Sequence, residues 1–283
     1  MKVAYYPGCS LEHSARDYQE SITAVADLLG LDLTEIPTWN CCGATAAHSI
    51  DAHLALRLAA RNLILAEGLG QDVVVPCALC YNRLKAAEYT LSQQPAALPD
   101  LAYQGSIRIW DLLEYLTQPL LLEQIVAKRR RSLQGLRTVC YYGCLVARPP
   151  KITGHPDYEN PTNMDTLIKR LGGAPYPWSH KTDCCGAGFT ISRPDIVETL
   201  AQRLYDRALE AGAECVVVSC QMCQANLDLP QARIARKTGK AYYLPVLYFT
   251  ELIGLALGHP EVTTWLSRHL VDPLPLLRQR GLL

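Results

Sequence analysis

The stretch DVVVPCALC at residues 72–80 recurs as CVVVSCQMC at residues 215–223. In each copy a run of valines, typical of a buried β-strand, leads directly into a Cys-x-x-Cys motif. The two copies lie 143 residues apart, and so do two Cys-Cys-Gly-Ala motifs that begin at Cys41 and Cys184. A repeat of this length indicates two copies of one domain, because the units of a solenoid are much shorter.

Strand and helix patterns alternate on both sides of the first valine run. We expect strands at 2–7, 31–37, 72–76 and 106–110, and helices at 14–30, 49–70 and 81–92, with Ser49 as an N-cap. This order, repeated in the second half, predicts an α/β fold of two duplicated Rossmann-like domains. Each would be a small, mainly parallel sheet flanked by helices, and the two would be related by a pseudo-two-fold axis. We place the N-terminal domain at 1–125 and the C-terminal domain at 136–283.

The cysteines follow the predicted strands. In the first half Cys9 comes after the first strand, Cys41 and Cys42 after the second, and Cys77 and Cys80 after the third, at the start of a helix. Ligands of open α/β sheets bind at the carboxyl ends of the strands. We therefore expect five thiols to meet at one sheet edge in each half, where helix N-termini favour thiolates.

Composition and charge exclude several classes of protein. The 27 basic and 27 acidic residues balance to a formal net charge of zero, so no basic field points to nucleic acid. No apolar run is long enough for a membrane span, and the first residues do not have the pattern of a signal peptide. We therefore expect a cytoplasmic protein, in whose reducing surroundings twelve cysteines point to metal ligands or redox thiols.

Five thiols in each half favour an iron–sulfur cluster over a single metal ion. Structural zinc accepts four ligands, and two adjacent cysteines reach one small ion only with strained geometry. They can reach different metals of a cluster that contains several irons. A zinc site remains an alternative at this point, and so does a dithiol relay through Cys77 and Cys80.

The pattern of Cys9, Cys41-Cys42-Gly43 and Cys77-x-x-Cys80 resembles the cysteine-rich CCG domain, and it recurs around Cys184-Cys185-Gly186. With two such domains, the whole chain resembles the B-type subunits of heterodisulfide reductases. The resemblance implies two non-cubane [4Fe–4S] clusters, with a disulfide cleaved between them in two one-electron steps. The ligands that it implies are Cys9, Cys41, Cys42, Cys77 and Cys80 for one cluster, and Cys144, Cys184, Cys185, Cys220 and Cys223 for the other.

The resemblance also implies partners. Electrons would come from a C-type, ferredoxin-like subunit with [4Fe–4S] clusters, which a flavin-containing A-type subunit would reduce. The substrate would be a disulfide or a thiol. An alternative is an electron-transfer subunit that passes electrons toward quinone, as CCG-domain subunits do in some succinate, lactate and glycolate oxidoreductases.

Other residues near the motifs are weaker candidates. His48, His155 and His180 would protonate a departing thiolate or bind an acidic part of the substrate, and Arg148 and Lys151 would contact acidic substrate groups. An ordinary surface or capping role is the alternative for each histidine. Lys181 lies beside His180, just before the second Cys-Cys motif. We interpret Cys140 and Cys215 as packed thiols rather than ligands. Matching VAYYPGC (3–9) to VCYYGC (139–144) with one residue deleted places Cys140 opposite Ala4.

Overall fold

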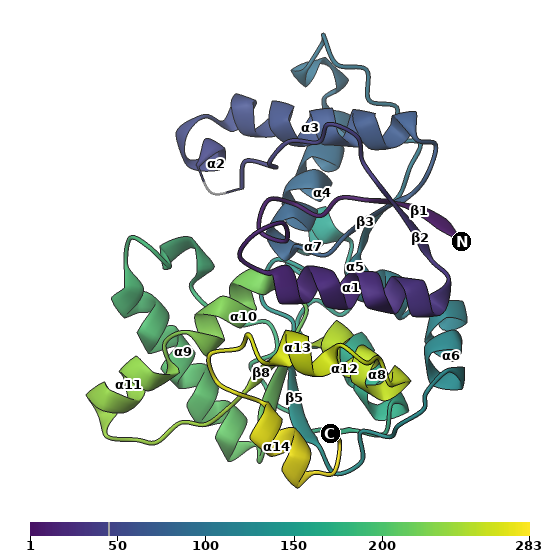
Figure 1. The fold of residues 1–283 in the computed structure, drawn as a ribbon. Coiled ribbons are helices and arrows are strands. Elements are labelled where there is room, and N and C mark those ends of the chain that lie inside the picture. The colour runs from purple at the N-terminus through teal and green to yellow at the C-terminus, as the bar shows by residue number, and fades with distance from the viewer. Residues whose placement is uncertain (45) are drawn as a thin grey trace.

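The computed structural model describes residues 1–44 and 46–283, and it contains two parallel four-stranded sheets (Figure 1). The first sheet has the order β2-β1-β3-β4, and the second has the order β6-β5-β7-β8. The strands are β1 (Lys2–Tyr5), β2 (Asp32–Glu35), β3 (Val73–Val75), β4 (Ile109–Asp111), β5 (Arg137–Tyr141), β6 (Ala174–Pro175), β7 (Cys215–Val218) and β8 (Val246–Tyr248). The predicted α/β fold with two similar halves is confirmed.

Helices cover both faces of the sheets. Those of the first half are α1 (Arg16–Leu29), α2 (Ala47–Ile50), α3 (Ala52–Gly68), α4 (Ala78–Gln93), η1 (Pro95–Ala97), α5 (Leu112–Leu116) and α6 (Pro119–Ala127). Those of the second half are α7 (Pro150–Thr153), α8 (Asn163–Arg170), η2 (Ala187–Phe189), α9 (Pro194–Glu210), α10 (Gln221–Asp228), α11 (Gln231–Thr238), α12 (Phe249–Leu257), α13 (Val262–Leu266) and α14 (Leu274–Gln279). The predicted limit at residue 125 falls inside α6, and the domain boundaries stay a prediction.

Strand β1 divides its side chains between two cores, as the two-residue period of a strand requires. Val3 and Tyr5 pack in the core that includes α1, and Ala4 and Tyr6 pack in the core that includes residues of α3 and α4. All three valines of β3 are fully buried. A strand buried on both faces explains the uninterrupted apolar run in the sequence.

Helix α1 belongs to the first half by sequence but packs against α12 of the second, and Figure 1 shows it between the two sheets. Tyr18 stacks on Tyr248 with ring centroids 4.1 Å apart and an interplanar angle of 4°. The hydroxyl groups of Ser21 and Thr250 lie 2.7 Å apart in the same buried contact. An aromatic pair of this kind contributes about 1 kcal/mol beyond the area that it buries.

A buried charged cluster lies in the same interface. Nε2 of His269 is 2.8 Å from Oε1 of Glu251 and 3.7 Å from Oδ2 of Asp17. Burial alone lowers the pKa of His269, but the neighbouring Glu251 carboxylate outweighs it and raises that pKa to about 9. The imidazolium therefore pairs α1 with the second half at neutral pH.

The structure corrects two sequence expectations. Ala4 pairs with Val73, and Val139 pairs with Val216. Because Val216 is the repeat equivalent of Val73, Val139 and not Cys140 is the equivalent of Ala4. Cys9 follows Ala4 by five residues and Cys144 follows Val139 by five, so the repeat needs no deletion. The helix predicted over 49–70 is interrupted between α2 and α3, and its N-cap is Asp51, not Ser49.

Replacing Asp51 with Ala is expected to lower the free energy of unfolding by about 1 kcal/mol, because an Asp51 carboxylate oxygen accepts hydrogen bonds from the backbone N–H groups of His53 (2.8 Å) and Leu54 (3.0 Å). Urea denaturation measures the change. Asp51→Asn keeps an acceptor and should stay close to the unmodified protein. Equal stability of all three proteins would contradict the assigned cap.

The His269 cluster predicts a pH-dependent stability. The folded pKa of about 9 lies above the ordinary value of 6.5, so the stabilisation is fully present below pH 6.5 and is lost as pH rises through 9. The loss is on the order of 3 kcal/mol. Denaturation at several pH values measures it, and His269→Gln, which cannot titrate, should flatten this part of the profile. An unchanged slope in the variant would contradict the charge assigned to His269.

Candidate functional site

The first thiol set lies at the carboxyl edge of the first sheet. It consists of Cys9, Cys41, Cys42, Cys77 and Cys80, which follow β1, β2 and β3. Cys77 is the N-cap of α4, and its sulfur accepts a hydrogen bond from the N–H of Cys80 (3.4 Å). The sulfurs of Cys42 and Cys80 lie 3.3 Å apart. The hydrogen bond with Cys42 raises the pKa of Cys41 most, followed by burial, and the exposed Cys9 lies close enough to add to this shift.

The second thiol set repeats this arrangement at the edge of the second sheet. It consists of Cys144, Cys184, Cys185, Cys220 and Cys223. The sulfurs of Cys185 and Cys223 lie 3.6 Å apart, and Cys144 and Cys184 are hydrogen-bonded to each other. Cys220 is the N-cap position of α10, as Cys77 is of α4. In both sheets the first and third strands are neighbours at the point where the strand order reverses, which is where such sheets bind ligands.

Two glycines let the backbone approach the sulfurs. Gly8 and Gly143 have φ angles of +73° and +70°, and a Cβ atom on either would lie 2.9 or 2.8 Å from the sulfur of Cys80 or Cys223. Any other residue would meet both a strained backbone and a clash. The glycines after the adjacent cysteines turn the chain so that the N–H of Gly186 donates to the Cys184 sulfur at 3.2 Å.

Proton sharing within each set favours the thiolate form of some cysteines and raises the pKa of their partners Cys41, Cys80, Cys144 and Cys223. Hydrogen bonds from Cys41 and Cys80 lower the pKa of the Cys42 thiol to about 4. A hydrogen bond from Cys144 lowers the pKa of the Cys184 thiol to about 6. The thiolate is the form of cysteine that binds metals, so the surroundings of both sets prepare them for that role.

The two thiol sets face each other across the boundary between the halves. The side chain of Gln221, next to Cys220, lies near the Cys77 thiol, whose pKa is lowered most by the Cys80 thiol and less by Gln221. The hydroxyl of Tyr18 donates to the carbonyl of Ser219 at 3.0 Å. Nδ2 of Asn82 donates to the carbonyls of Leu145 and Arg148 at 3.0 and 2.9 Å. These contacts hold the start of α4 against the loop after β5, and α1 against the start of α10.

The other predicted residues divide into exposed and packed groups. His48 is exposed on α2, and Lys151 is exposed on α7. Nδ1 of His180 is 2.8 Å from Asp183, and the ammonium of Lys181 is 3.0 Å from Asp165, so both have acidic partners. His155 is partly buried beside a cavity.

Arg148 and the two extra cysteines have packed positions. Arg148 donates to the hydroxyl of Thr182 at 2.9 Å. Cys140 and Cys215 are fully buried within β5 and β7, away from the sheet edge that carries the second thiol set. Their roles as packed thiols stay predictions, which their places inside strands support.

Sequence reasoning missed Gln221 and Tyr18. Gln221 occupies the position of Ala78 in the first Cys-x-x-Cys motif, so a polar residue in one copy only was the available signal. Tyr18 lies on the apolar face of α1 and looks like an ordinary core residue in the sequence.

The donor sets fit a group with several metal atoms. All cysteines in the described part of the chain are free thiols, and each set joins more thiols than the four that one zinc ion accepts. Neighbouring sulfurs within 4 Å of one another fit thiolate ligands of an iron–sulfur cluster.

Comparison with known proteins supports the duplicated arrangement. The cysteine-rich domain (CCG) family matches residues 3–85 and 138–228. The chain is 32% identical over 280 residues to the 8-methylmenaquinol:fumarate reductase membrane anchor subunit of Wolinella succinogenes, covering 96% of this chain and 98% of the relative. It is 28% identical over 269 residues to the B-type subunit of the ferredoxin/F(420)H(2)-dependent CoB-CoM heterodisulfide reductase of Methanosarcina acetivorans, covering 91% and 89%.

A solved structure shares the fold. The crystal structure of a hypothetical protein from Helicobacter pylori superposes with a TM-score of 0.74 at 13% identity, over 96% of this chain and 52% of that one. The present chain thus spans about half of that protein. The predicted resemblance to the B-type subunits of heterodisulfide reductases is confirmed, and the chain belongs to the cysteine-rich CCG domain family, with one copy of the domain in each half.

Proposed function

We propose that this protein is the iron–sulfur subunit of an oxidoreductase complex that reduces a disulfide to two thiols, or forms the disulfide in the reverse direction. The ten cysteines of the two thiol sets would hold two non-cubane [4Fe–4S] clusters. The proposal includes a cytoplasmic location. Every described cysteine is a free thiol, and free thiols persist in reducing compartments.

The observation that carries the proposal is the contact between the two thiol sets. Asn82, two residues after Cys80, donates to the carbonyl of Leu145, the neighbour of Cys144, at 3.0 Å. Two similar five-thiol sets therefore meet at one place, from opposite halves. A disulfide bound there would have each of its sulfurs next to one set.

Buried tyrosines hold the chain segments that surround the two thiol sets. When bound, the two clusters supply one electron each, which matches the two electrons that a disulfide accepts. Tyr18, fully buried, closes one side by its hydrogen bond to the Ser219 carbonyl. Tyr6 and Tyr141, also fully buried, donate to the carbonyls of Asn40 (2.7 Å) and Asp183 (2.6 Å) and hold the loops that carry the adjacent cysteines.

The proposal requires electron-carrying partners. The described thiols are all accounted for by the two sets and the two buried strand cysteines. We propose a C-type ferredoxin-like subunit as the direct electron donor, which a flavin-containing A-type subunit reduces in turn. Relatives named as subunits of heterodisulfide reductases support a place in a complex.

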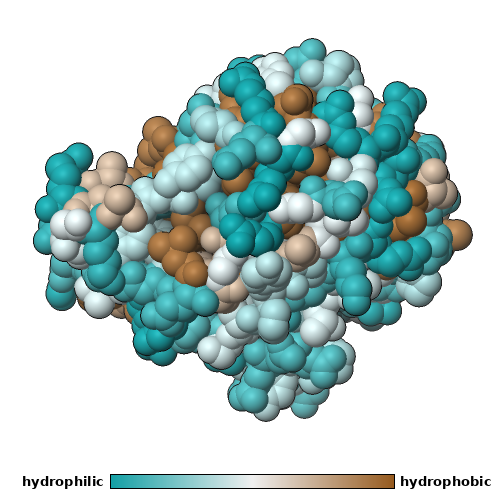
Figure 2. Space-filling view, turned by 90° about the horizontal axis from the view of Figure 1, so that it is seen from below, coloured by the Kyte–Doolittle hydropathy of each residue, from teal (hydrophilic) through white to brown (hydrophobic). Residues whose placement is uncertain are grey.

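A second candidate is electron transfer toward quinone, which the relative from Wolinella succinogenes favours through its name and its 32% identity. None of the helices in residues 1–44 and 46–283 has the length and apolar character needed to cross a bilayer. On the face shown in Figure 2, apolar side chains form separate patches between hydrophilic ones.

Electron paramagnetic resonance of anaerobically purified protein distinguishes the two candidates. The oxidised protein is measured alone, with a low-molecular-weight thiol, and with a water-soluble quinol. A new signal with the thiol only supports disulfide chemistry. A response to the quinol only supports the second candidate, and identical spectra in all three samples contradict both.

Replacing Cys42 or Cys185 with Ser is expected to remove one cluster, and with it about half of the bound iron and all disulfide turnover. Iron analysis and a turnover assay with an artificial electron donor measure both effects. Cys215→Ala is the matched control, because Cys215 is buried in β7 outside the thiol sets. Full iron content in both serine variants would contradict the ligand assignment.

The glycines provide a test that leaves every sulfur in place. Gly143→Ala adds a Cβ atom 2.8 Å from the sulfur of Cys223, so we expect a lower iron content in the second set. Gly239→Ala has the same φ of +70° with nothing within 4 Å, and should cost about 1 kcal/mol of stability without loss of iron. Equal iron content in the two variants would show that the close approach at Gly143 does not matter.

A further inference from the structure

A polar cavity of about 470 Å³ lies where the first half meets the loop between α7 and α8. Its walls come from the start of α4, the end of β4, helix α5 and residues 153–163. The residues that the argument uses are Tyr81, Lys85, Asp111, Glu114 and His155. None of them belongs to the thiol sets.

Two buried polar atoms of the lining residues lack a partner in the described part of the chain. Asp111 is 2% exposed, and its Oδ2 accepts from the N–H groups of Leu113 (3.0 Å) and Glu114 (3.2 Å), but its Oδ1 has no hydrogen-bond partner. Nδ1 of His155 is also buried and unpartnered. Unsatisfied buried groups are costly, so two around one polar cavity indicate exchangeable water between them.

Asp111 lies on the same sheet edge as the first thiol set. It pairs in register with Val75, and Cys77 follows Val75 by two residues. The buried Tyr18 hydroxyl lies between the two regions. Burial raises the pKa of Tyr18 most, and negative charge at Asp111, Cys220 and Cys77 raises it further. Asp111 thus lies between the cavity and the meeting point of the two thiol sets.

The second half has no equivalent of this opening among the described residues. Tyr248 takes the register position of Asp111, opposite Val218, and stacks on Tyr18. Glu251, three residues after Tyr248 as Glu114 is after Asp111, is fully buried against His269. A carboxyl group beside a cavity is therefore a feature of the first half and not of the duplicated fold.

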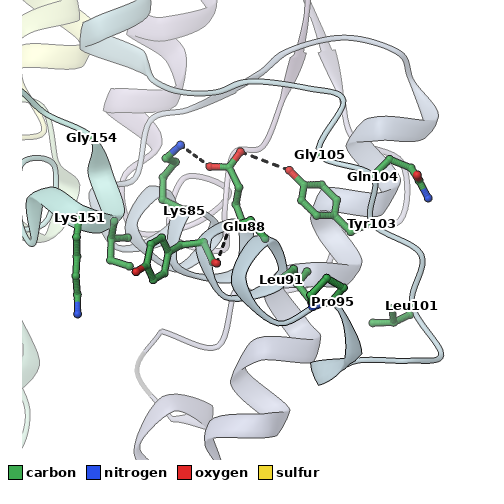
Figure 3. A pocket seen from close by; sticks show the side chains of 13 residues that line it. Lys85, Glu88, Leu91, Pro95, Leu101, Tyr103, Gln104, Gly105, Lys151 and Gly154 are labelled. Carbon is green, nitrogen blue, oxygen red and sulfur yellow. Dashed lines mark hydrogen bonds and ion pairs between the residues drawn. The ribbon is translucent and has the colours of Figure 1, made fainter.

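A second cavity of about 590 Å³ adjoins the first. It shares Lys85 and Gly154 with the first cavity. Figure 3 shows Lys85 paired with Glu88, and Glu88 joined to the hydroxyl of Tyr103 at 3.5 Å, along one side of this space. These polar side chains line the space beside the cavity that contains Asp111.

We propose that the cavity is a proton-uptake site, in which Asp111 receives protons from cavity water and passes them toward the first thiol set. The inference rests on the proposed function. Reduction of a disulfide breaks the S–S bond, takes two electrons from the one-electron carrier subunit and binds two protons to form two S–H bonds. Asp111 supplies these protons and regains them from water beside His155.

The charges around Asp111 agree with this role. Burial is the largest influence on Asp111 and raises its pKa to about 7, so that it gains and loses a proton near neutral pH. The groups that face it are Glu114 on α5, Tyr81 and Lys85 on α4, Arg108 just before β4, Tyr18 on α1, and His155 and Asp157 on the loop.

The test is Asp111→Asn, which keeps an N-cap oxygen for α5 but cannot exchange a proton. In the unmodified protein, disulfide turnover with an artificial electron donor should fall as pH rises through about 7. In the variant we expect turnover at about pH 6 to be at least about tenfold lower, and this pH limb to disappear. Asp195→Asn, at an exposed carboxylate on α9 of the second half, should keep the normal profile.

Infrared difference spectroscopy provides a readout that does not need turnover. The band of a protonated carboxyl group should be present at about pH 6, lost by about pH 8, and absent from Asp111→Asn. Normal turnover and pH dependence in that variant, or a carboxylate already ionised at pH 6, would overturn the inference. Absence of turnover in the unmodified protein would overturn the disulfide function alone, and the infrared titration would still decide whether Asp111 takes up a proton.

Discussion

The hydrogen bonds from Asn82 to the carbonyls of Leu145 and Arg148 mark the constraint on which the site depends: two separate sheets present their carboxyl edges to each other. Each edge gathers five thiols because parallel strands end on the same side. The contact between the edges is held from outside by α1, whose Tyr18 stacks on Tyr248 and bonds Ser219. Helix α1 thus contributes to the core of the second half as well as covering its own sheet.

Duplication explains the symmetry of the thiols, and divergence explains the differences around them. The glycines that approach Cys80 and Cys223 have nearly the same φ and nearly the same distance to sulfur in both halves. Glu114 and Glu251 are each the third residue after the N-cap, in α5 and in α12. Glu251 is fully buried beside His269, whereas Glu114 lines a cavity. In the proposed reaction each thiol set would supply one electron, whereas both protons would come from the first half.

Much of the fold could be predicted because its signals are local. The valine runs of β3 and β7 are buried on both faces and read as strands without any knowledge of their neighbours. The break at Asp51 was missed because alanine and leucine continue the helical pattern across it. Contacts between the halves could not be predicted, since the chain does not reveal how two domains are oriented. Asp111 was missed for a related reason: nothing local distinguishes it from an ordinary N-cap.

The measurement that tests the account most directly is the iron, acid-labile sulfide and zinc content of anaerobically purified protein, together with the number of thiols that remain open to alkylation. The account predicts about four irons and four sulfides for each thiol set, with the ten cysteines protected until the metal is removed. About one zinc ion per set, without labile sulfide, would contradict it.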